Sequence, residues 1–195
     1  MPPTDHPSPP APGPAGPGDP SATPDDAAPD DAEREREVAA RTARQRIAAG
    51  ALVRDPAGRI LMVEPSYKPT WEIPGGMVEA QESPLDACHR EIREELGIDV
   101  PITRLLVVDW VPRRGVWPEG LLFVFDGGTM SPDRLAEVTL PDDELLAVRF
   151  VTLAQARNHV GPGMHLRLRE ALTAALSPHG APVYLEQGRH RLAPA

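Results

Sequence analysis

The chain has 195 residues, with 29 Asp and Glu, 20 Lys and Arg, 25 Pro and one cysteine, and its formal net charge is −9. A single cysteine excludes an intrachain disulfide scaffold and a cysteine-rich zinc site, and the negative charge disfavours a nucleic-acid binder that works through a broad basic surface. Because no apolar stretch reaches the ~18 residues of a bilayer span, and the N-terminus lacks the basic start and apolar run of a signal peptide, we expect a cytoplasmic protein with no membrane partner.

The N-terminal segment differs in composition from the rest of the chain. Residues 1–40 carry a net charge of −7 and residues 41–195 only −2, and eleven prolines fall within the first 30 residues. With almost no large apolar side chains, this segment cannot bury enough surface to offset chain entropy. We therefore expect residues 1–40 to form a disordered, Pro-rich acidic tail that leads into a short helix at 31–46, where Glu/Arg pairs recur at helical spacing. A tail that docks a partner protein is the alternative.

Short runs of Val, Ile and Leu predict strands in the remainder of the chain. These runs are 47–53, 60–63, 102–111, 121–125 and 145–151. A turn signal at 55–58 predicts that the first two form a hairpin. Helical patterns occupy 84–96 and 153–176, the second broken at 161–163. The alternation predicts a single α/β domain at 41–178 with helices covering its sheet, followed by a C-terminal extension at 179–195.

The helix predicted at 84–96 has well-defined ends and one apolar face. Ser83 is a good N-cap residue and Pro84 suits the first helical position, while Gly97 supplies a C-terminal stop. Spacings of three and four residues predict an apolar stripe that packs on the core. The stripe consists of Leu85, Cys88, Ile92 and Leu96.

Three carboxylates share another face of the same helix. Relative to Glu91, the side chain of Glu95 lies about 40° round the helix and that of Glu94 about 60° the other way, since each residue turns about 100°. Adjacent carboxylates repel and need a positive neighbour, and oxygen ligands suit hard divalent ions. The alternative is a solvated acidic face pinned by an Arg90–Glu94 pair. The glycines at 75–76 permit close backbone approach, which favours the metal hypothesis.

The segment that begins at Gly76 resembles the signature of the Nudix hydrolases. Gly76, five residues, Glu82, seven residues and then the run at 90–98 match every position of the 23-residue signature. The resemblance extends more loosely over about residues 46–176. One departure is Gln81, where the family commonly has glycine, and a need for positive φ at this position would strain the loop.

The resemblance implies an α/β/α sandwich with a mixed β-sheet. It also implies a metal-dependent pyrophosphohydrolase that cleaves a nucleoside diphosphate linked to another moiety, such as a nucleoside triphosphate or a nucleotide sugar. Such a protein would use Mg²⁺ or Mn²⁺, would act on a small-molecule nucleotide with no nucleic-acid partner, and is compatible with a homodimer. The alternative is a nucleotide-sensing regulatory module with this fold and little turnover, which would be expected to lose the acids that are all present here.

Roles for individual residues also come from the resemblance. Glu91 would be a metal ligand or the base that positions water, Arg90 would orient the carboxylates, and Glu144 would be a further ligand or base from outside the helix. The implied metal ligands are the Gly75 carbonyl and the carboxylates of Glu91, Glu94 and Glu95.

A loop between two predicted strands offers candidate substrate contacts. Arg113 and Arg114 could bind phosphate, and Trp117 could stack on a base. The alternative is an ordinary hairpin loop with one semi-exposed aromatic ring. His159 and His165 flank the break at 161–163 and could line a cleft, although histidine does not suit a hard-ion site.

Overall fold

The computed structural model describes residues 31–140, 144–177 and 180–191. The chain divides into two units, residues 1–43 and residues 44–195. The described part of the first unit is helix α1 (Asp31–Arg41), in which no residue is buried. The helix ends at Arg41 and not at residue 46 as predicted, because the chain is already in a strand at Arg46. The tail expected at 1–30 lies outside the described residues.

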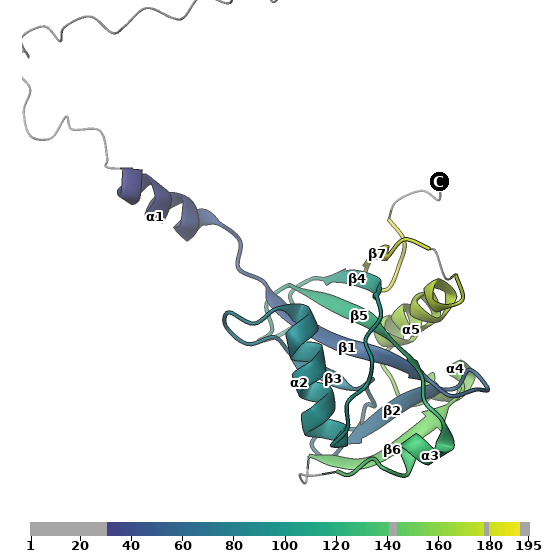
Figure 1. Ribbon diagram of the computed structural model, residues 1–195. Helices are drawn as coiled ribbons and strands as arrows, with labels where there is room; N and C mark the ends of the chain where they lie inside the picture. The colour runs from purple at the N-terminus through teal and green to yellow at the C-terminus, as the bar shows by residue number, and fades with distance from the viewer. Residues whose placement is uncertain (1–30, 141–143, 178–179, 192–195) are drawn as a thin grey trace, which may run out of the picture. The chain divides into compact units, whose positions relative to one another are not determined.

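The second unit is built on a mixed sheet of seven strands (Figure 1). The strands are β1 (Arg46–Arg54), β2 (Ile60–Pro65), β3 (Gly75–Met77), β4 (Leu105–Val111), β5 (Gly120–Thr129), β6 (Leu145–Val151) and β7 (Val183–Glu186). They lie in the order β6-β2-β1-β5-β4-β7, with β3 paired to β1. The β1–β5 and β4–β7 pairs are parallel and the other pairs are antiparallel. The predicted α/β class and mixed sheet are therefore confirmed.

Helices cover both faces of this sheet. They are α2 (Pro84–Leu96), α3 (Pro132–Leu135), α4 (Leu153–Ala156) and α5 (Pro162–Ala175). One core lies between the sheet and α2, and includes Ile92 and Leu96. The other lies between the sheet and α4 and α5, and includes Leu168. Each fully buried Leu or Ile contributes roughly 1.5–3 kcal/mol, so the two cores hold the helices on opposite faces, as in the sandwich implied by the sequence.

One buried carboxylate stabilises the turn of the first hairpin. Strands β1 and β2 pair in antiparallel fashion, and the Asp55 Oδ1 atom between them accepts hydrogen bonds from the backbone N–H groups of Ala57 at 3.0 Å and Arg59 at 2.8 Å. An Asp that binds backbone amides ahead of it in this way stabilises a turn. The predicted hairpin is confirmed.

Two short strands have no counterpart in the sequence prediction. Strand β3 has three residues, too few to show an alternating pattern. Strand β7 lies in the segment that was treated as a C-terminal extension; it pairs with β4, and its Leu185 is fully buried. Residues 183–186 therefore belong to the sheet.

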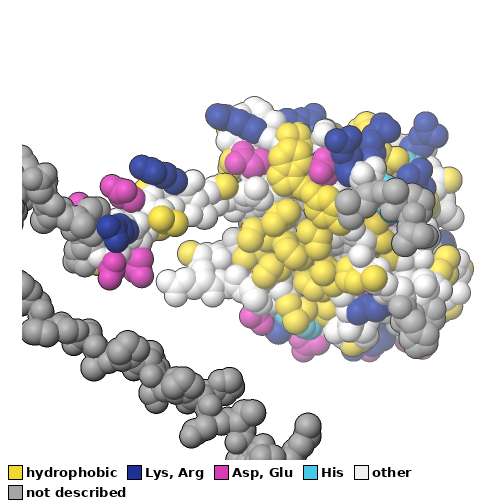
Figure 2. Space-filling view, turned by 90° about the horizontal axis from the view of Figure 1, so that it is seen from above, with side chains coloured by type: hydrophobic (Ala, Val, Ile, Leu, Met, Phe, Trp, Pro, Cys, Tyr) yellow, Lys and Arg dark blue, Asp and Glu magenta, His cyan; other side chains and the backbone are white. Residues whose placement is uncertain are grey.

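Part of the sheet surface remains apolar and accessible. Figure 2, which views the molecule from above in Figure 1, shows apolar side chains gathered across the middle of the second unit. Strands β4 and β7 are drawn at the upper side of the second unit in Figure 1. On these strands Val108 and Trp110 are half-buried and Tyr184 is exposed. None of the described helices is long and apolar enough to cross a membrane.

Candidate active site

Helix α2 begins and ends as its sequence predicts. The Ser83 Oγ atom accepts a hydrogen bond from the Asp86 N–H at 3.1 Å. At the other end Gly97 has φ of 66°, and its N–H donates to the Arg93 carbonyl at 2.9 Å. Positive φ is a conformation that glycine adopts at little cost. These local contacts fix the length of the helix.

The apolar residues of α2 determine which face of the helix packs on the sheet, and the prediction for one of them was wrong. Cys88, Ile92 and Leu96 are buried as predicted, but Leu85 is 41% exposed and Ala87 is buried in the first turn. The sheet therefore contacts this turn through a small side chain, and the larger one points to solvent. This orientation leaves the glutamates of α2 outside the core.

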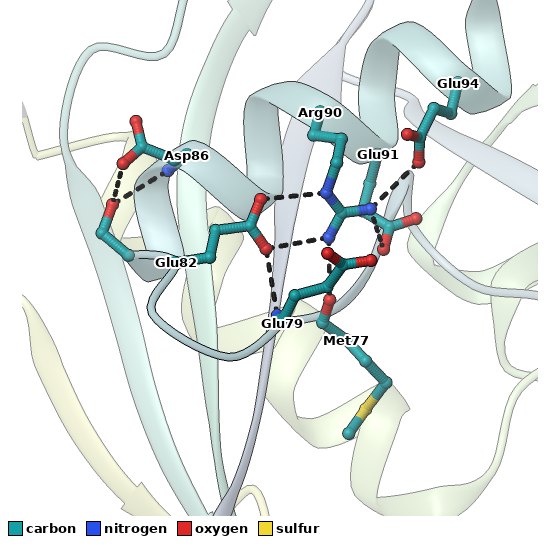
Figure 3. A network of polar contacts seen from close by, with 8 residues as sticks. Met77, Glu79, Glu82, Asp86, Arg90, Glu91 and Glu94 are labelled. Atoms are coloured by element: carbon teal, nitrogen blue, oxygen red, sulfur yellow. Dashed lines mark hydrogen bonds and ion pairs between the residues drawn. The ribbon is translucent and has the colours of Figure 1, made fainter.

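Arg90 is the centre of the polar network on that face (Figure 3). Its guanidinium binds Glu82 in bidentate geometry, with both distances 2.9 Å. It also donates to Glu91 at 2.9 Å, to Glu94 at 3.0 Å and to the Met77 carbonyl at 3.0 Å. The predicted Arg90–Glu94 pair is thus one contact among several. Arg90 joins the helix to the loop before it.

Glu82 binds the backbone of the loop that precedes α2. One of its carboxylate oxygens accepts a hydrogen bond from the Glu79 N–H at 3.0 Å. Its contacts with Arg90, and then this backbone hydrogen bond, lower the pKa of Glu82 to about 2. Glu82 is therefore a charged anchor for the loop.

Glu95 lies between α2 and the glycine loop. Its Oε2 atom accepts a hydrogen bond from the Gly75 N–H at 2.8 Å. Burial raises the pKa of Glu95 to about 8, against the effect of this hydrogen bond, and the negative charges of Glu91, Glu72 and Glu144 raise it further. A carboxylate in these surroundings is ionised readily only beside a positive charge.

Glu91 packs against the second glycine of the loop. A Cβ atom added to Gly76 would overlap the Glu91 carboxyl group, so only glycine permits this approach. Partial burial raises the pKa of Glu91, and Arg90 opposes that effect. The backbone at 75–76 and the carboxylates of Glu91 and Glu95 therefore form one contiguous oxygen-rich surface.

Two further acids contribute negative charge to this surface from outside the helix. Glu144 is exposed just before β6, and its backbone carbonyl accepts a hydrogen bond from the Ser66 N–H at 2.7 Å. Glu72 precedes β3, and both its backbone groups pair with Val63 of β2. Both charges act on Glu95. Glu72 was missed in the sequence, although it lies only three residues before Gly75.

The donor set suits a hard divalent cation, although the side chains are not arranged around one. Among the described residues, no three His, Cys, Asp or Glu side chains form a group that could already hold a metal ion. Arg90 binds Glu91 and Glu94, and the Gly75 N–H binds Glu95. Carboxylate and carbonyl oxygens are the ligands that Mg²⁺ and Mn²⁺ prefer, and a nearby cation would favour the charged form of the half-buried Glu95. The residues therefore fit such an ion.

Comparison with known proteins identifies the family. The model of the NUDIX domain matches residues 44–172. The chain belongs to the Nudix hydrolase family. The resemblance found in the sequence is thereby confirmed, and so is the assignment as a hydrolase of phosphoric anhydride bonds. Members of this family use divalent metal ions.

Individual relatives support the same assignment. The chain is 33% identical over 142 residues to a MutT-like protein of Streptomyces ambofaciens, covering 73% of this chain and 83% of that one. It is 38% identical over 77 residues to an RNA pyrophosphohydrolase of Halorhodospira halophila, but covers only 42% of that relative. The crystal structure of a MutT Nudix hydrolase from Burkholderia pseudomallei superposes with a TM-score of 0.54 at 26% identity, over 68% of this chain and 98% of that one.

The contact between the Nudix glycine loop and Glu91 leads to a first prediction. We expect Gly76→Ala to lower kcat/KM by about 10²-fold, because the added methyl group displaces the Glu91 carboxylate, and a shift of about 1 Å at a reacting centre has effects of this size. The fold should persist, since the displaced group is the end of a flexible side chain. Steady-state kinetics and thermal melting measure the two effects. Gly163→Ala is the control, because its added Cβ meets nothing within 4 Å apart from its chain neighbours and the backbone of its own helix; equal activity of the two variants would contradict the prediction.

Gln81 adopts the backbone conformation that its place in the Nudix signature suggested. Its φ is 65°, in the left-handed region where the family commonly has glycine. A side chain in this region costs about 1–2 kcal/mol. We therefore expect Gln81→Gly to raise the free energy of unfolding by about 0.5–1 kcal/mol, measured by urea denaturation. Gln45→Gly, at an exposed site without positive φ, should not stabilise the protein, and a decrease with Gln81→Gly would refute the strain argument.

The loop that carries the candidate substrate residues connects β4 to β5. It lies beside the start of β1, because Gly120 of β5 pairs with Arg46 of β1. Arg114 and Trp117 pair with each other through their backbones, and the Arg46 guanidinium lies 5.8 Å from the centre of the Trp117 ring. Arg113, Arg114 and Trp117 are all exposed. Glu95 contacts Gly75, which pairs with Gly50. Gly50 is four residues from Arg46, or roughly 13 Å along a strand. The loop and the carboxylates therefore lie at different positions along β1, separated by about this length.

The two histidines singled out in the sequence are held inside the domain. The ring of His159 stacks on Trp71 at 3.8 Å between centroids, and the Arg149 guanidinium lies over the same indole at 5.6 Å. Trp71 is therefore in contact with groups of the domain itself. The Nδ1 atom of His165 is buried and has no hydrogen-bond partner among the described residues.

Proposed function

We propose that the chain is a divalent-metal-dependent pyrophosphohydrolase that cleaves a nucleoside diphosphate linked to another moiety. The observation that carries this proposal is the surface formed by Glu91, Glu94 and Glu95 against the backbone of the glycine loop. A diphosphate is polyanionic and cannot approach such a surface unless cations screen the repulsion. The same cations supply an acidified water as nucleophile near neutral pH. The function therefore depends on Mg²⁺ or Mn²⁺.

The protein groups in this proposal have separate roles. Glu91, Glu94, Glu95 and the Gly75 carbonyl would hold the cation, and Arg90 would orient the glutamates. The contacts of Arg90 with Glu82 and the Met77 carbonyl fix its guanidinium independently of Glu91 and Glu94. We assign to Glu144 the role of a further ligand or of the base that orients water. Its exposed position before β6 and its effect on Glu95 support this assignment.

The loop before β5 is proposed to contact the part of the substrate that extends beyond the diphosphate. Arg113 and Arg114 offer charge-assisted hydrogen bonds, and Trp117 offers an exposed aromatic ring. The separation of roughly 13 Å along β1 suits a substrate longer than the diphosphate alone.

A release screen tests the proposed function. Nucleoside triphosphates, nucleotide sugars, ADP-ribose, dinucleoside polyphosphates and RNA with a 5′-triphosphate would be incubated with the full chain and Mg²⁺ or Mn²⁺. Phosphate or pyrophosphate release and the nucleotide products would be measured with and without EDTA. Metal-dependent release of a nucleotide from at least one substrate supports the proposal. No turnover of any of them, in any metal, would favour a nucleotide-sensing role.

A further inference from the structure

A hollow of about 390 Å³ lies beside the carboxylate surface, between the end of β2 and the start of β6. It is lined by Glu64, the segment 65–69 and Leu146. Tyr67 is 71% exposed and Leu146 is 63% exposed. Neither side chain contributes much buried surface to the fold, so both are accessible to a ligand in the hollow.

One backbone hydrogen bond and one ion pair join this hollow to residues that flank the carboxylate surface. The Ser66 N–H donates to the carbonyl of Glu144 at 2.7 Å. In the ion pair the Lys68 ammonium lies 2.6 Å from the carboxylate of Glu72, three residues before the glycine that binds Glu95. The residues of the hollow are therefore in direct contact with Glu144 and Glu72, which flank Glu95.

Lys68 is the cation among the residues that line the hollow; it is paired with Glu72, and the acidic lining residue Glu64 is paired with Arg149. Lys68 is the single lysine of the chain, and its Nζ atom lies 5.1 Å from the centre of the Tyr67 ring. Partial burial opposes the charge, yet the hydrogen bond to Glu72 raises the pKa of Lys68. An aromatic ring, an aliphatic side chain and an ammonium group thus lie together, which complements a ligand with a flat base and an anionic group.

We propose that this hollow binds the nucleoside monophosphate half of the substrate, with the base against Tyr67 and Leu146 and its phosphate beside Lys68. The inference rests on the hydrolase function proposed above. It places the scissile diphosphate at the carboxylates and the other moiety toward the loop before β5. Trp71 is a poorer stacking platform, because the ring of His159 already stacks on it and the Arg149 guanidinium lies near it.

Calorimetric titration with nucleoside 5′-monophosphates tests the base contact. AMP, GMP, CMP and UMP contain no anhydride bond, so binding to the full chain in Mg²⁺ is measured without turnover, and ribose 5-phosphate reports the contribution of the phosphate alone. Stacking on an aromatic side chain strengthens binding by about 5- to 150-fold. We expect at least one nucleotide to bind more tightly than ribose 5-phosphate, and Tyr67→Ala to remove that difference.

Matched variants separate this contact from a general effect on the protein. Tyr184→Ala changes another exposed tyrosine, on β7, and Leu176→Ala is the counterpart of Leu146→Ala. Both controls should bind nucleotides as the wild type does, while Leu146→Ala should weaken nucleotide binding and leave ribose 5-phosphate unaffected. Melting temperatures would verify that all variants are folded. Wild-type nucleotide preference in Tyr67→Ala, or no preference in the wild type, overturns the proposal.

Lys68 is tested by its effect on both classes of probe. Lys68→Met should lower the affinity for nucleotides and for ribose 5-phosphate by about tenfold, the scale of one charge-assisted hydrogen bond, and Lys68→Arg should restore most of it. Unchanged affinity in Lys68→Met overturns the phosphate contact. These titrations are independent of hydrolysis. Failure of the release screen would therefore count against the proposed function. Absence of a nucleotide preference in the wild type, or its persistence in Tyr67→Ala, would count against the hollow.

Discussion

Replacement of Glu95 by Gln is expected to lower kcat by about 10²- to 10⁴-fold, the usual scale for a catalytic carboxylate. Glutamine keeps the size of the side chain and an oxygen that can accept the Gly75 N–H. It removes one negative charge from the surface that is proposed to hold the cation, so the cation should bind less tightly. Single-turnover and steady-state kinetics over a range of Mg²⁺ concentrations measure both effects.

The fold of this variant should remain intact without metal. The buried residues of α2, Cys88, Ile92 and Leu96, do not depend on the cation, and loss of a repelling charge should leave the melting temperature in EDTA equal to or above that of the wild type. Glu137→Gln is the control, because Glu137 is a surface residue paired with Arg134. Full activity of Glu95→Gln, or wild-type activity that EDTA does not diminish, would overturn the metal-hydrolase assignment.

Asp109→Asn is expected to lower the free energy of unfolding by about 3–5 kcal/mol. Asp109 of β4 is fully buried. It binds Arg167 of α5 at 2.6 Å and accepts the Gly188 N–H at 3.0 Å. The variant would leave the Arg167 guanidinium buried without its counter-charge, which costs far more than the loss of one neutral hydrogen bond. Urea denaturation of the two proteins measures the difference.

Two further variants test the cause of this loss. Asp99→Asn breaks an ion pair with Arg93 in which both side chains are exposed, so it should cost no more than about 1 kcal/mol. A double variant, Asp109→Leu with Arg167→Met, should recover most of the lost stability, because it removes both buried charges and keeps the packing. A cost for Asp109→Asn no greater than that for Asp99→Asn would rule out the buried-charge explanation.

The sequence by itself determined helix α2 and the carboxylates that it carries. Ser83, Pro84 and Gly97 set the ends of the helix through contacts within a few residues, and Glu91, Glu94 and Glu95 share a face because the helical repeat is fixed. The turn at Asp55 and the positive φ of Gln81 are local in the same sense. Interactions between residues close in the sequence depend little on the rest of the fold, and for this reason they could be predicted.

Only the tertiary structure decided which distant residues join that face. The hydrogen bond from Gly75 to Glu95 and the placement of Glu72 depend on how β3 pairs with β1, a pairing of three residues that leaves no periodic pattern in the sequence. Strand β7 belongs to the sheet because Leu185 is buried in the core beside β4, a strand that lies far from it in the sequence. Leu85 has the spacing of a core residue but is exposed, since the position of the sheet, and not the helical repeat, determines which side chains of the first turn are covered.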